Sequence, residues 1–413
     1  MSSESILNWE NKRLDEVVDI LDSRRVPINA KERSTREGNI PYFGATGQVG
    51  WIDDYLFDEE IILLGEDGAP FLDSSKQKAY VVRGKSWVNN HAHVLRAKPG
   101  VPALYLKYWL DRLDYHPYVN GTTRLKLTQG EMRNIPVAMA PERKRYEIVA
   151  EIEKQFSRLD EAVANLKRVK ANLKRYKVAV LKAAVEGRLV PTDGNWKTLA
   201  LGDIALSIRN GYSSKPDAES GTPILRISAV RPMALDVADV RYLSGALKEY
   251  ESFLISPGDV LFTRYNGNRD YVGVCACVPP GIEPTVYPDK LIRVRVPVST
   301  LLPEFLVIAA SAGSARAFLK SKIRTTAGQS GISGGDLKAL PLTLPCVAEQ
   351  HRIVDEVELH LSLVRGVETQ IDANLKRADV MRRSVLARVF RNDSAAAANV
   401  SLANNVAPFE ETV

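Results

Sequence analysis

The sequence contains little of what membrane-spanning, secreted or disulfide-rich proteins need. Three cysteines among 413 residues cannot build a disulfide framework, which favours a reducing compartment. No apolar run approaches the ~18 residues of a membrane-spanning helix. The polar N-terminus also lacks the apolar segment of a signal peptide. We therefore expect a soluble, cytoplasmic protein with no membrane partner.

The motifs of nucleotide binding and methyl transfer are missing as well. There is no Gly-x-x-x-x-Gly-Lys-Ser/Thr loop to hold phosphates, and the Pro279-Pro280 pair lies between Val278 and Gly281 instead of completing an Asn/Asp-Pro-Pro-Tyr/Phe motif. A metal nuclease could use Asp289 with Asp336, although several loop signals separate them. We expect no catalytic residue, metal or cofactor on this chain, and a cryptic nuclease stays an alternative.

What the sequence does contain is a repeat. The segment IVAEIE at 148–153 returns as IVDEVE at 353–358, about 205 residues later. An apolar heptad runs from Ile152 to Val180, and every matching position of the later segment is also apolar. The pattern predicts two long helices, each beginning after a proline, which could pair antiparallel because a whole domain separates them in the chain.

The segments before these helices repeat too. Trp9 matches Trp196, and the strand-like run 60–62 with Gly68 matches 259–261 with Gly267. We therefore predict an α+β protein in which two globular mixed α/β domains are separated by two long antiparallel coiled-coil helices in an internal pseudo-twofold repeat. The expected parts are a first domain at 1–140, a helix at 141–190, a second domain at 191–345, a helix at 346–391 and a disordered tail at 392–413.

Charge and loop composition favour nucleic acid as a partner. The net charge is +6 with a pI of about 9.0, and residues 166–177 hold six basic side chains and no acid, although such a run can be a solvated helix face. Loops at matching places of both domains carry Arg and Asn, which can contact base edges, and glycines that let the backbone approach phosphate. Each loop by itself could be an ordinary polar turn, but the recurrence favours DNA contact. The candidate contacts in the first domain are Tyr42, Thr46, Gln48, Asn89, His91, His93, Thr122, Thr123, Arg124 and Lys126. Those in the second domain are Arg226, Ser228, Thr263, Arg264, Asn266, Asn268, Arg269, Lys290, Arg324, Thr325, Thr326, Gln329 and Ser330.

The run Asn89-Asn90-His91-Ala92-His93 allows three interpretations. Two histidines two residues apart on a strand point to one face, so they could contact nucleic acid, hold a metal or form an ordinary polar strand face. No third metal ligand is evident in the sequence, and we predict no metal.

Several motifs resemble one known family. Residues 340–345 (LPLTLP) followed by 348–354 (AEQHRIV), together with 40–47 (IPYFGATG), 181–189 (LKAAVEGRL) and 258–264 (GDVLFTR), are similar to the specificity subunit of Type I restriction-modification enzymes. The resemblance covers Trp9 to Phe390. One departure is that the first helix enters through PERKRY at 141–146 and lacks the Glu-Gln pair of the second.

The resemblance implies a non-catalytic subunit with two target-recognition domains, each reading one half of a bipartite site on double-stranded DNA. The paired helices would set the unread gap. Two methyltransferase (modification) subunits, which bind S-adenosylmethionine, would dock on the chain, and restriction subunits that use ATP and Mg would join them. The expected docking residues on the helices are Arg168, Lys174, Arg175, Gln350 and Arg352. A stand-alone methyltransferase recognition subunit and a coiled-coil scaffold that binds proteins remain alternatives.

Overall fold

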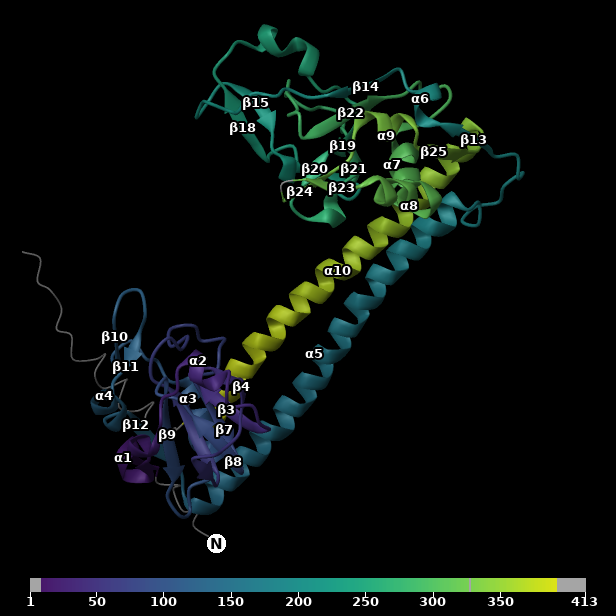
Figure 1. Ribbon diagram of the computed structural model, residues 1–413. Helices are drawn as coiled ribbons and strands as arrows, with labels where there is room; N and C mark the ends of the chain where they lie inside the picture. Colours follow the sequence, from purple (N-terminus) through teal and green to yellow (C-terminus); the bar gives the residue numbers. More distant parts are fainter. Residues whose placement is uncertain (1–8, 327, 392–413) are drawn as a thin grey trace, which may run out of the picture. The chain divides into compact units, whose positions relative to one another are not determined.

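The computed structural model describes residues 9–326 and 328–391 (Figure 1). The chain forms two compact units. The first unit combines Met1–Lys167 with Asp372–Val413, and the second is Arg168–Ile371. The predicted disordered tail, 392–413, lies outside the described residues.

The first unit is built around a four-stranded antiparallel sheet. Its strand order is β2-β9-β6-β7, formed by Val18–Ile20, Ala92–Ala97, Ile61–Gly65 and Ala79–Val82. Every residue of β6 is buried, as expected for a central strand covered on both faces. Helix α3 (Ala103–Arg112) packs against this sheet. A second sheet in this unit has the order β4-β3-β8-β5, formed by Gly47–Ile52, Ile40–Gly44, Lys85–Val88 and Phe57–Asp58.

The second unit contains the same central sheet again. Its order is β14-β22-β19-β21, formed by Ser207–Asn210, Leu291–Arg295, Val260–Thr263 and Cys275–Cys277, and all of its pairs are antiparallel. Helix α7 (Pro303–Ser311) packs against it as α3 does in the first unit. The repeated strand order confirms the predicted duplication of a mixed α/β domain.

The remaining short elements also match in pairs. Strand β1 (Glu10–Arg13) pairs with β12 (Pro136–Met139), and β13 (Lys197–Ala200) pairs with β25 (Pro341–Leu344), both antiparallel. Thr128 and Ser333 cap the short helices α4 (Gln129–Arg133) and α9 (Gly334–Lys338), each accepting a hydrogen bond from a backbone N–H three residues ahead. The second unit adds helix α8 (Gly313–Lys322) and small strand pairs. Those pairs join β15 (Thr222–Leu225) to β18 (Val240–Leu243), β16 (Val230–Arg231) to β17 (Ala234–Leu235), and β24 (Gln329–Gly331) to both β20 (Tyr265–Asn266) and β23 (Arg324–Thr326).

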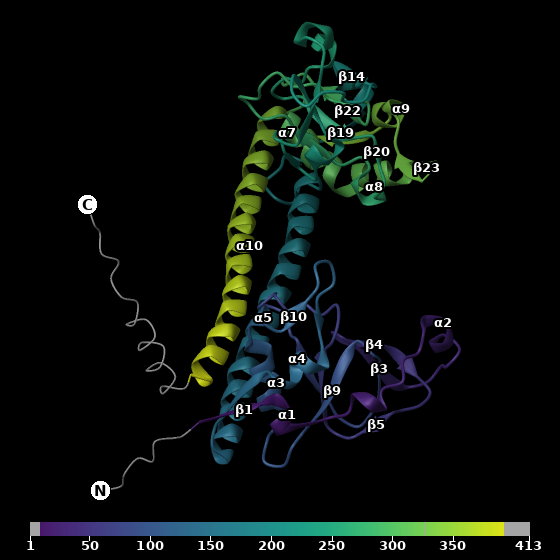
Figure 2. The same ribbon diagram turned by 90° about the vertical axis from the view of Figure 1, so that its left-hand side faces the viewer.

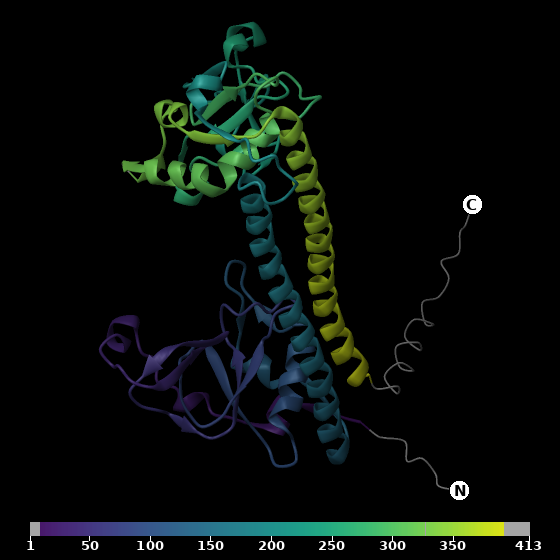
Figure 3. The same ribbon diagram turned by 90° about the vertical axis from the view of Figure 1, so that its right-hand side faces the viewer.

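The two predicted long helices are confirmed as α5 (Glu142–Val185) and α10 (Val347–Val389). Within each unit they lie side by side and antiparallel (Figures 1, 2 and 3). In the first unit Asp160 pairs with Arg382, and in the second Lys177 pairs with Glu368 at 2.8 Å. No helix in the described parts of the chain is both long and apolar enough to cross a membrane. The boundary between the units falls inside both helices, so the domain limits expected from the sequence stay predictions.

Equivalent side chains attach each long helix to its own unit. Gln350, fully buried, donates to the carbonyls of Pro345 (3.1 Å) and Thr300 (2.9 Å) and accepts from the N–H of Leu302 (2.9 Å). At the matching place in the first unit, Arg145 donates to the carbonyls of Ala140 (2.6 Å) and Gly100 (2.5 Å). Arg145 thus takes the place of the glutamine of the Glu-Gln pair, because it bonds the two matching backbone carbonyls of the first unit.

Candidate nucleic-acid interface

A groove of about 710 Å³ opens on the second unit. Its walls come from the segment 212–216 after β14, the end of β15, the turn around β20, and residues 288–290 before β22. It brings together six of the predicted DNA contacts, which are Arg226, Ser228, Asn266, Asn268, Lys290 and Gln329.

The turn after β19 is held in place by backbone pairing. The N–H of Arg264 donates to the carbonyl of Lys290 at 2.8 Å, and β20 then pairs with β24. A Cβ on Gly331 would lie 2.3 Å from the Tyr265 ring, so the aromatic ring needs a glycine beneath it. Asn266 accepts from the N–H of Asn268 at 2.9 Å, which fixes the polar end of the turn.

The groove is strongly cationic. Five basic side chains line it against the one carboxylate of Asp289, and they are Lys215, Arg226, Arg231, Arg241 and Lys290. Arg226 pairs with Asp239 at 3.3 Å yet stays half-exposed. Clustered positive charge in a concave surface raises the local concentration of polyanions. The aromatic ring of Tyr265 lies beside Arg264 (4.6 Å) and Lys290 (5.2 Å), and aromatic rings among cations also suit the bases and phosphates of nucleic acid.

Some of the DNA contacts predicted for this unit are buried in the structure. Thr263 is fully buried in β19, because both faces of that strand are covered, and Ser330 is buried with its hydroxyl 3.0 Å from that of Thr325. Neither side chain is available for DNA contact. Arg264 is half-buried and donates to the carbonyl of Asp289 at 3.3 Å. Arg269 and Arg324 are exposed, and Thr326 pairs through its backbone with Gln329 in β23 and β24.

In the first unit, the predicted cations gather around two acidic residues at the end of β6. Asp67 pairs with Arg124 (2.8 Å) and His91 (2.7 Å), and Glu66 pairs with Lys126 (3.4 Å). Arg124 and Lys126 are exposed. Neither Glu66 nor Asp67 was among the residues predicted from the sequence, because a single acidic side chain in a loop repels phosphate and so gives no signal of DNA contact.

Other first-unit candidates divide between exposed and buried places. Thr46, Gln48, Thr122 and Thr123 are exposed. Tyr42 is buried, and its hydroxyl faces the carbonyl of Ile28 at 3.4 Å, so it packs in the core beneath β3. Asn89 is also buried and accepts from the N–H of His91 at 2.8 Å, which makes it a support for the turn.

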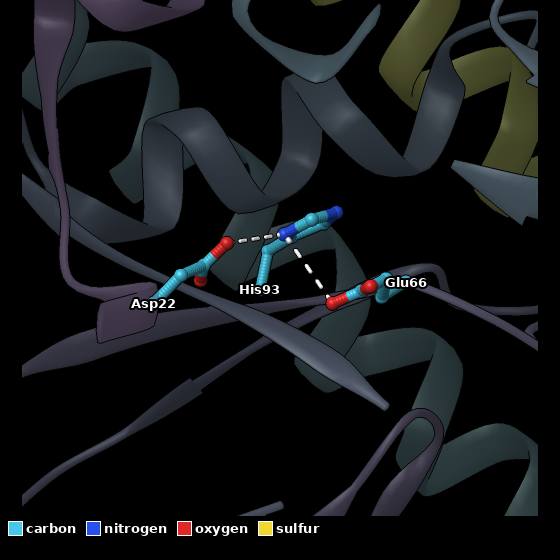
Figure 4. A group of neighbouring side chains, drawn as sticks. All are labelled: Asp22, Glu66 and His93. Carbon is cyan, nitrogen blue, oxygen red and sulfur yellow. Dashed lines mark hydrogen bonds and ion pairs between the residues drawn. The ribbon is translucent and has the colours of Figure 1, made fainter. Parts of the chain in front are cut away.

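His93 does not share a strand face with His91, because β9 begins only at Ala92. It is buried with Nδ1 2.6 Å from Asp22 and 3.8 Å from Glu66 (Figure 4). Its Nε2 is 2.9 Å from the carbonyl oxygen of Leu127. Burial works against ionisation of Asp22, but hydrogen bonds from His93, Gln129 and the N–H of Val94 outweigh it and hold the pKa of Asp22 below its usual range. His93 therefore supports the fold and does not face DNA.

The same group has the ligand types of a metal site, since Asp22, Glu66 and His93 each place one ligand atom within 4.8 Å of the others. The surroundings fit a metal poorly. Arg25 already lies 2.6 Å from Glu66 and 3.5 Å from Asp22, so a guanidinium occupies the cation position. Both ring nitrogens of His93 also lie within hydrogen-bond distance of protein oxygens, on Asp22 and on the carbonyl of Leu127, so the protein already occupies both ligand positions of the ring.

The predicted docking residues on the helices are exposed with one exception. Arg168, Lys174, Arg175 and Arg352 lie on exposed faces of α5 and α10. Gln350 is fully buried and uses its amide to hold α10 to its own unit, so it cannot be a docking residue. Asp336, considered above for a nuclease, accepts from the N–H (2.8 Å) and hydroxyl (2.6 Å) of Ser333 as part of the α9 cap.

Comparison with known proteins agrees with these features. Residues 6–175 match the family model of the Type I restriction modification DNA specificity domain. The Type I restriction enzyme EcoKI specificity subunit of Escherichia coli (strain K12) is 37% identical over 279 residues, which cover 65% of this chain and 59% of that protein. Residues 6–175 thus resemble a DNA specificity domain, and the chain is similar to the specificity subunits of Type I restriction enzymes.

A second relative is the StySPI specificity subunit of Salmonella potsdam, 28% identical over 277 residues, 65% of this chain and 59% of that protein. The chain thus matches about three-fifths of the length of these curated relatives. A chain from a type I R-M system structure has a TM-score of 0.69 at 15% identity, covering 94% of this chain and 99% of its own. The HsdS subunit from Thermoanaerobacter tengcongensis has a TM-score of 0.53 at 16% identity, covering 95% and 99%. These structures support the predicted fold class.

Proposed function

We propose that the chain is the sequence-specific DNA-binding specificity subunit of a Type I restriction-modification complex, in which each unit reads one half of a bipartite duplex site. The observation that carries this proposal is the cationic groove of the second unit. It gathers, from separate segments of the chain, side chains of the types that bind phosphate and read base edges, as DNA recognition needs. The similarity of the chain to Type I restriction enzyme specificity subunits favours the same function.

The partners follow from the same proposal. Two methyltransferase subunits carrying S-adenosylmethionine dock on the exposed faces of α5 and α10, where Arg168, Lys174, Arg175 and Arg352 lie. Restriction subunits that use ATP and Mg join that assembly in the cytoplasm. The chain itself performs no chemistry in this arrangement, and its role is to select the site.

Methylation mapping tests the proposal. The chain is expressed with its methyltransferase subunit in a host without other DNA methylation, and methylated adenines are located across the genome. A split motif with a constant gap is the expected result. Absence of any motif, with a purified complex that ignores duplex DNA at low salt, would refute DNA recognition and favour a protein-binding scaffold.

Salt dependence tests the groove directly. A plot of log affinity against log salt has a negative slope, and each lost phosphate contact reduces the magnitude of that slope by about 0.9. The double variant Arg226→Ala/Lys290→Ala should therefore lower the slope by about 1.8. The matched control Lys197→Ala/Lys248→Ala removes the same charge from exposed positions outside the groove and should leave the slope nearly unchanged.

A further inference from the structure

The two units carry different side chains at the same place in the repeated sheet. The central strand β6 runs on into Glu66, Asp67 and Gly68, and the central strand β19 runs on, past Arg264, into Tyr265, Asn266 and Gly267. Through its backbone, Asp67 forms an isolated antiparallel β-bridge with Lys126. Asn266 likewise pairs through its backbone with Ser330 of β24. A carboxylate in one unit thus corresponds to an amide in the other, in segments that carry the predicted DNA contacts of both.

The carboxylate of Asp67 fixes an exposed arginine. Its Oδ1 lies 2.8 Å from Nη2 of Arg124 and 2.7 Å from Nδ1 of His91, and that imidazole nitrogen is 3.5 Å from the same Nη2. Gly68, at φ +67°, lies beneath the guanidinium, and a Cβ there would be 3.2 Å from Nε. Arg124 is therefore held on three sides although 60% of its side chain is exposed.

Such an arrangement is poorly suited to a phosphate contact. A carboxylate beside Arg124 cancels much of the attraction that a phosphate would feel, and a flexible lysine serves phosphate equally well. Base reading has the opposite requirement. The guanidinium has five N–H donors in a rigid plane, and two of them can contact the two acceptors of guanine in the major groove. A guanidinium that is already oriented loses little conformational freedom when it makes this contact.

We propose that Asp67 is a positioning residue that orients Arg124 for bidentate contact with a guanine in the half-site read by the first unit. This inference rests on the proposed function. The second unit has no carboxylate at this place, and Asn266 offers an amide there, so the two units read their half-sites with different chemistry from one shared architecture.

Duplex-binding measurements test the proposal with the full chain in complex with its methyltransferase subunit. The wild-type motif is determined first, and duplexes carrying each base at each position of the first unit's half-site are then compared. We expect one guanine position to be preferred by about 10-fold or more in the wild type. Asp67→Asn should abolish that preference without lowering affinity for unrelated duplex, because it removes a negative charge and preserves side-chain shape.

Three further variants separate orientation from charge. Gly68→Ala should weaken the preference with no change in charge, because its Cβ would lie 3.2 Å from Nε of Arg124 and shift the guanidinium, and φ +67° would strain the backbone there. Arg124→Lys should also lose the preference for guanine, since an ammonium group cannot make the bidentate contact of a guanidinium. Lys126→Ala is the matched control, and it should weaken binding equally for all bases and lower the salt slope by about 0.9. Melting curves confirm that each variant is folded.

The outcomes are distinct. A wild-type complex that selects no motif refutes the proposed function itself. A wild-type motif whose guanine preference survives Asp67→Asn overturns this inference alone. It is likewise overturned if Lys126→Ala changes base preference while Arg124→Lys does not.

Discussion

Removing the Gln350 amide should destabilise the attachment of α10 to the second unit. The side chain is fully buried and makes three hydrogen bonds, to the carbonyls of Thr300 and Pro345 and from the N–H of Leu302. Gln350→Ala leaves all three backbone groups without their partner. At about 1–1.5 kcal/mol for each bond, the free energy of unfolding should fall by about 3–5 kcal/mol. This is a large part of the 5–15 kcal/mol typical of a domain.

Gln350→Glu should destabilise by a similar amount. The carboxylate can still accept from Leu302, but its second oxygen would face two carbonyl oxygens and its charge would be buried. Arg145→Met in the first unit should cost less, about 1–3 kcal/mol, because that site is half-buried and water can reach the two carbonyls.

Hydrogen–deuterium exchange with mass spectrometry can measure this effect for each unit separately. Gln350→Ala should accelerate exchange at the start of α10 and in the sheet of the second unit, and urea unfolding should shift accordingly. The exposed neighbour Arg352→Ala is the control and should change stability by less than about 0.5 kcal/mol. A loss below about 1 kcal/mol for Gln350→Ala would show that the bonds are not formed as described and would refute the reasoning.

Two other predictions concern buried ionisable groups. The pKa of Asp22 is lowered in the folded state, so its contribution to stability is present above about pH 3.9 and is lost as the pH falls through the folded pKa. At pH 7, Asp22→Asn should lower the free energy of unfolding by about 3 kcal/mol, because it removes the carboxylate partner of His93. The acid limb of a stability–pH curve should also flatten. An unchanged limb would contradict this assignment. Burial raises the pKa of Cys275 and of Cys277 to about 12, so at pH 8 a thiol reagent should modify only the exposed Cys346 in native protein and all three cysteines in denaturant. Rapid modification of a second native thiol would be the opposing result.

The architecture could be predicted from the sequence because its signals are long and repeated. A heptad carried from Ile152 to Val180 and restated about 205 residues later is strong evidence of two helices, since chance rarely repeats a spacing at every position. The groove could be predicted in part, because Asn266, Asn268 and Lys290 lie in polar turns where chemistry and exposure coincide.

Burial could not be predicted at single polar positions. Thr263 and Ser330 look like loop donors in the sequence, but the strand pairing that covers them joins segments distant in the chain. The Asp22–His93 contact joins residues 71 positions apart, and no local pattern predicts it. Gln350 belongs to a motif that suggested docking, whereas its partners show a bond within its own unit.

The order in which the chain is synthesised has consequences for the first unit. That unit takes its last core side chains, Val385, Leu386 and Phe390, from the far end of α10, and Phe390 packs against Tyr105 and Trp109. The second unit is one continuous stretch and leaves the ribosome in full before them. At typical translation speeds the roughly 220 intervening residues take about 10–45 s. During that interval the apolar surface that these three side chains cover in the first unit has no partner from α10.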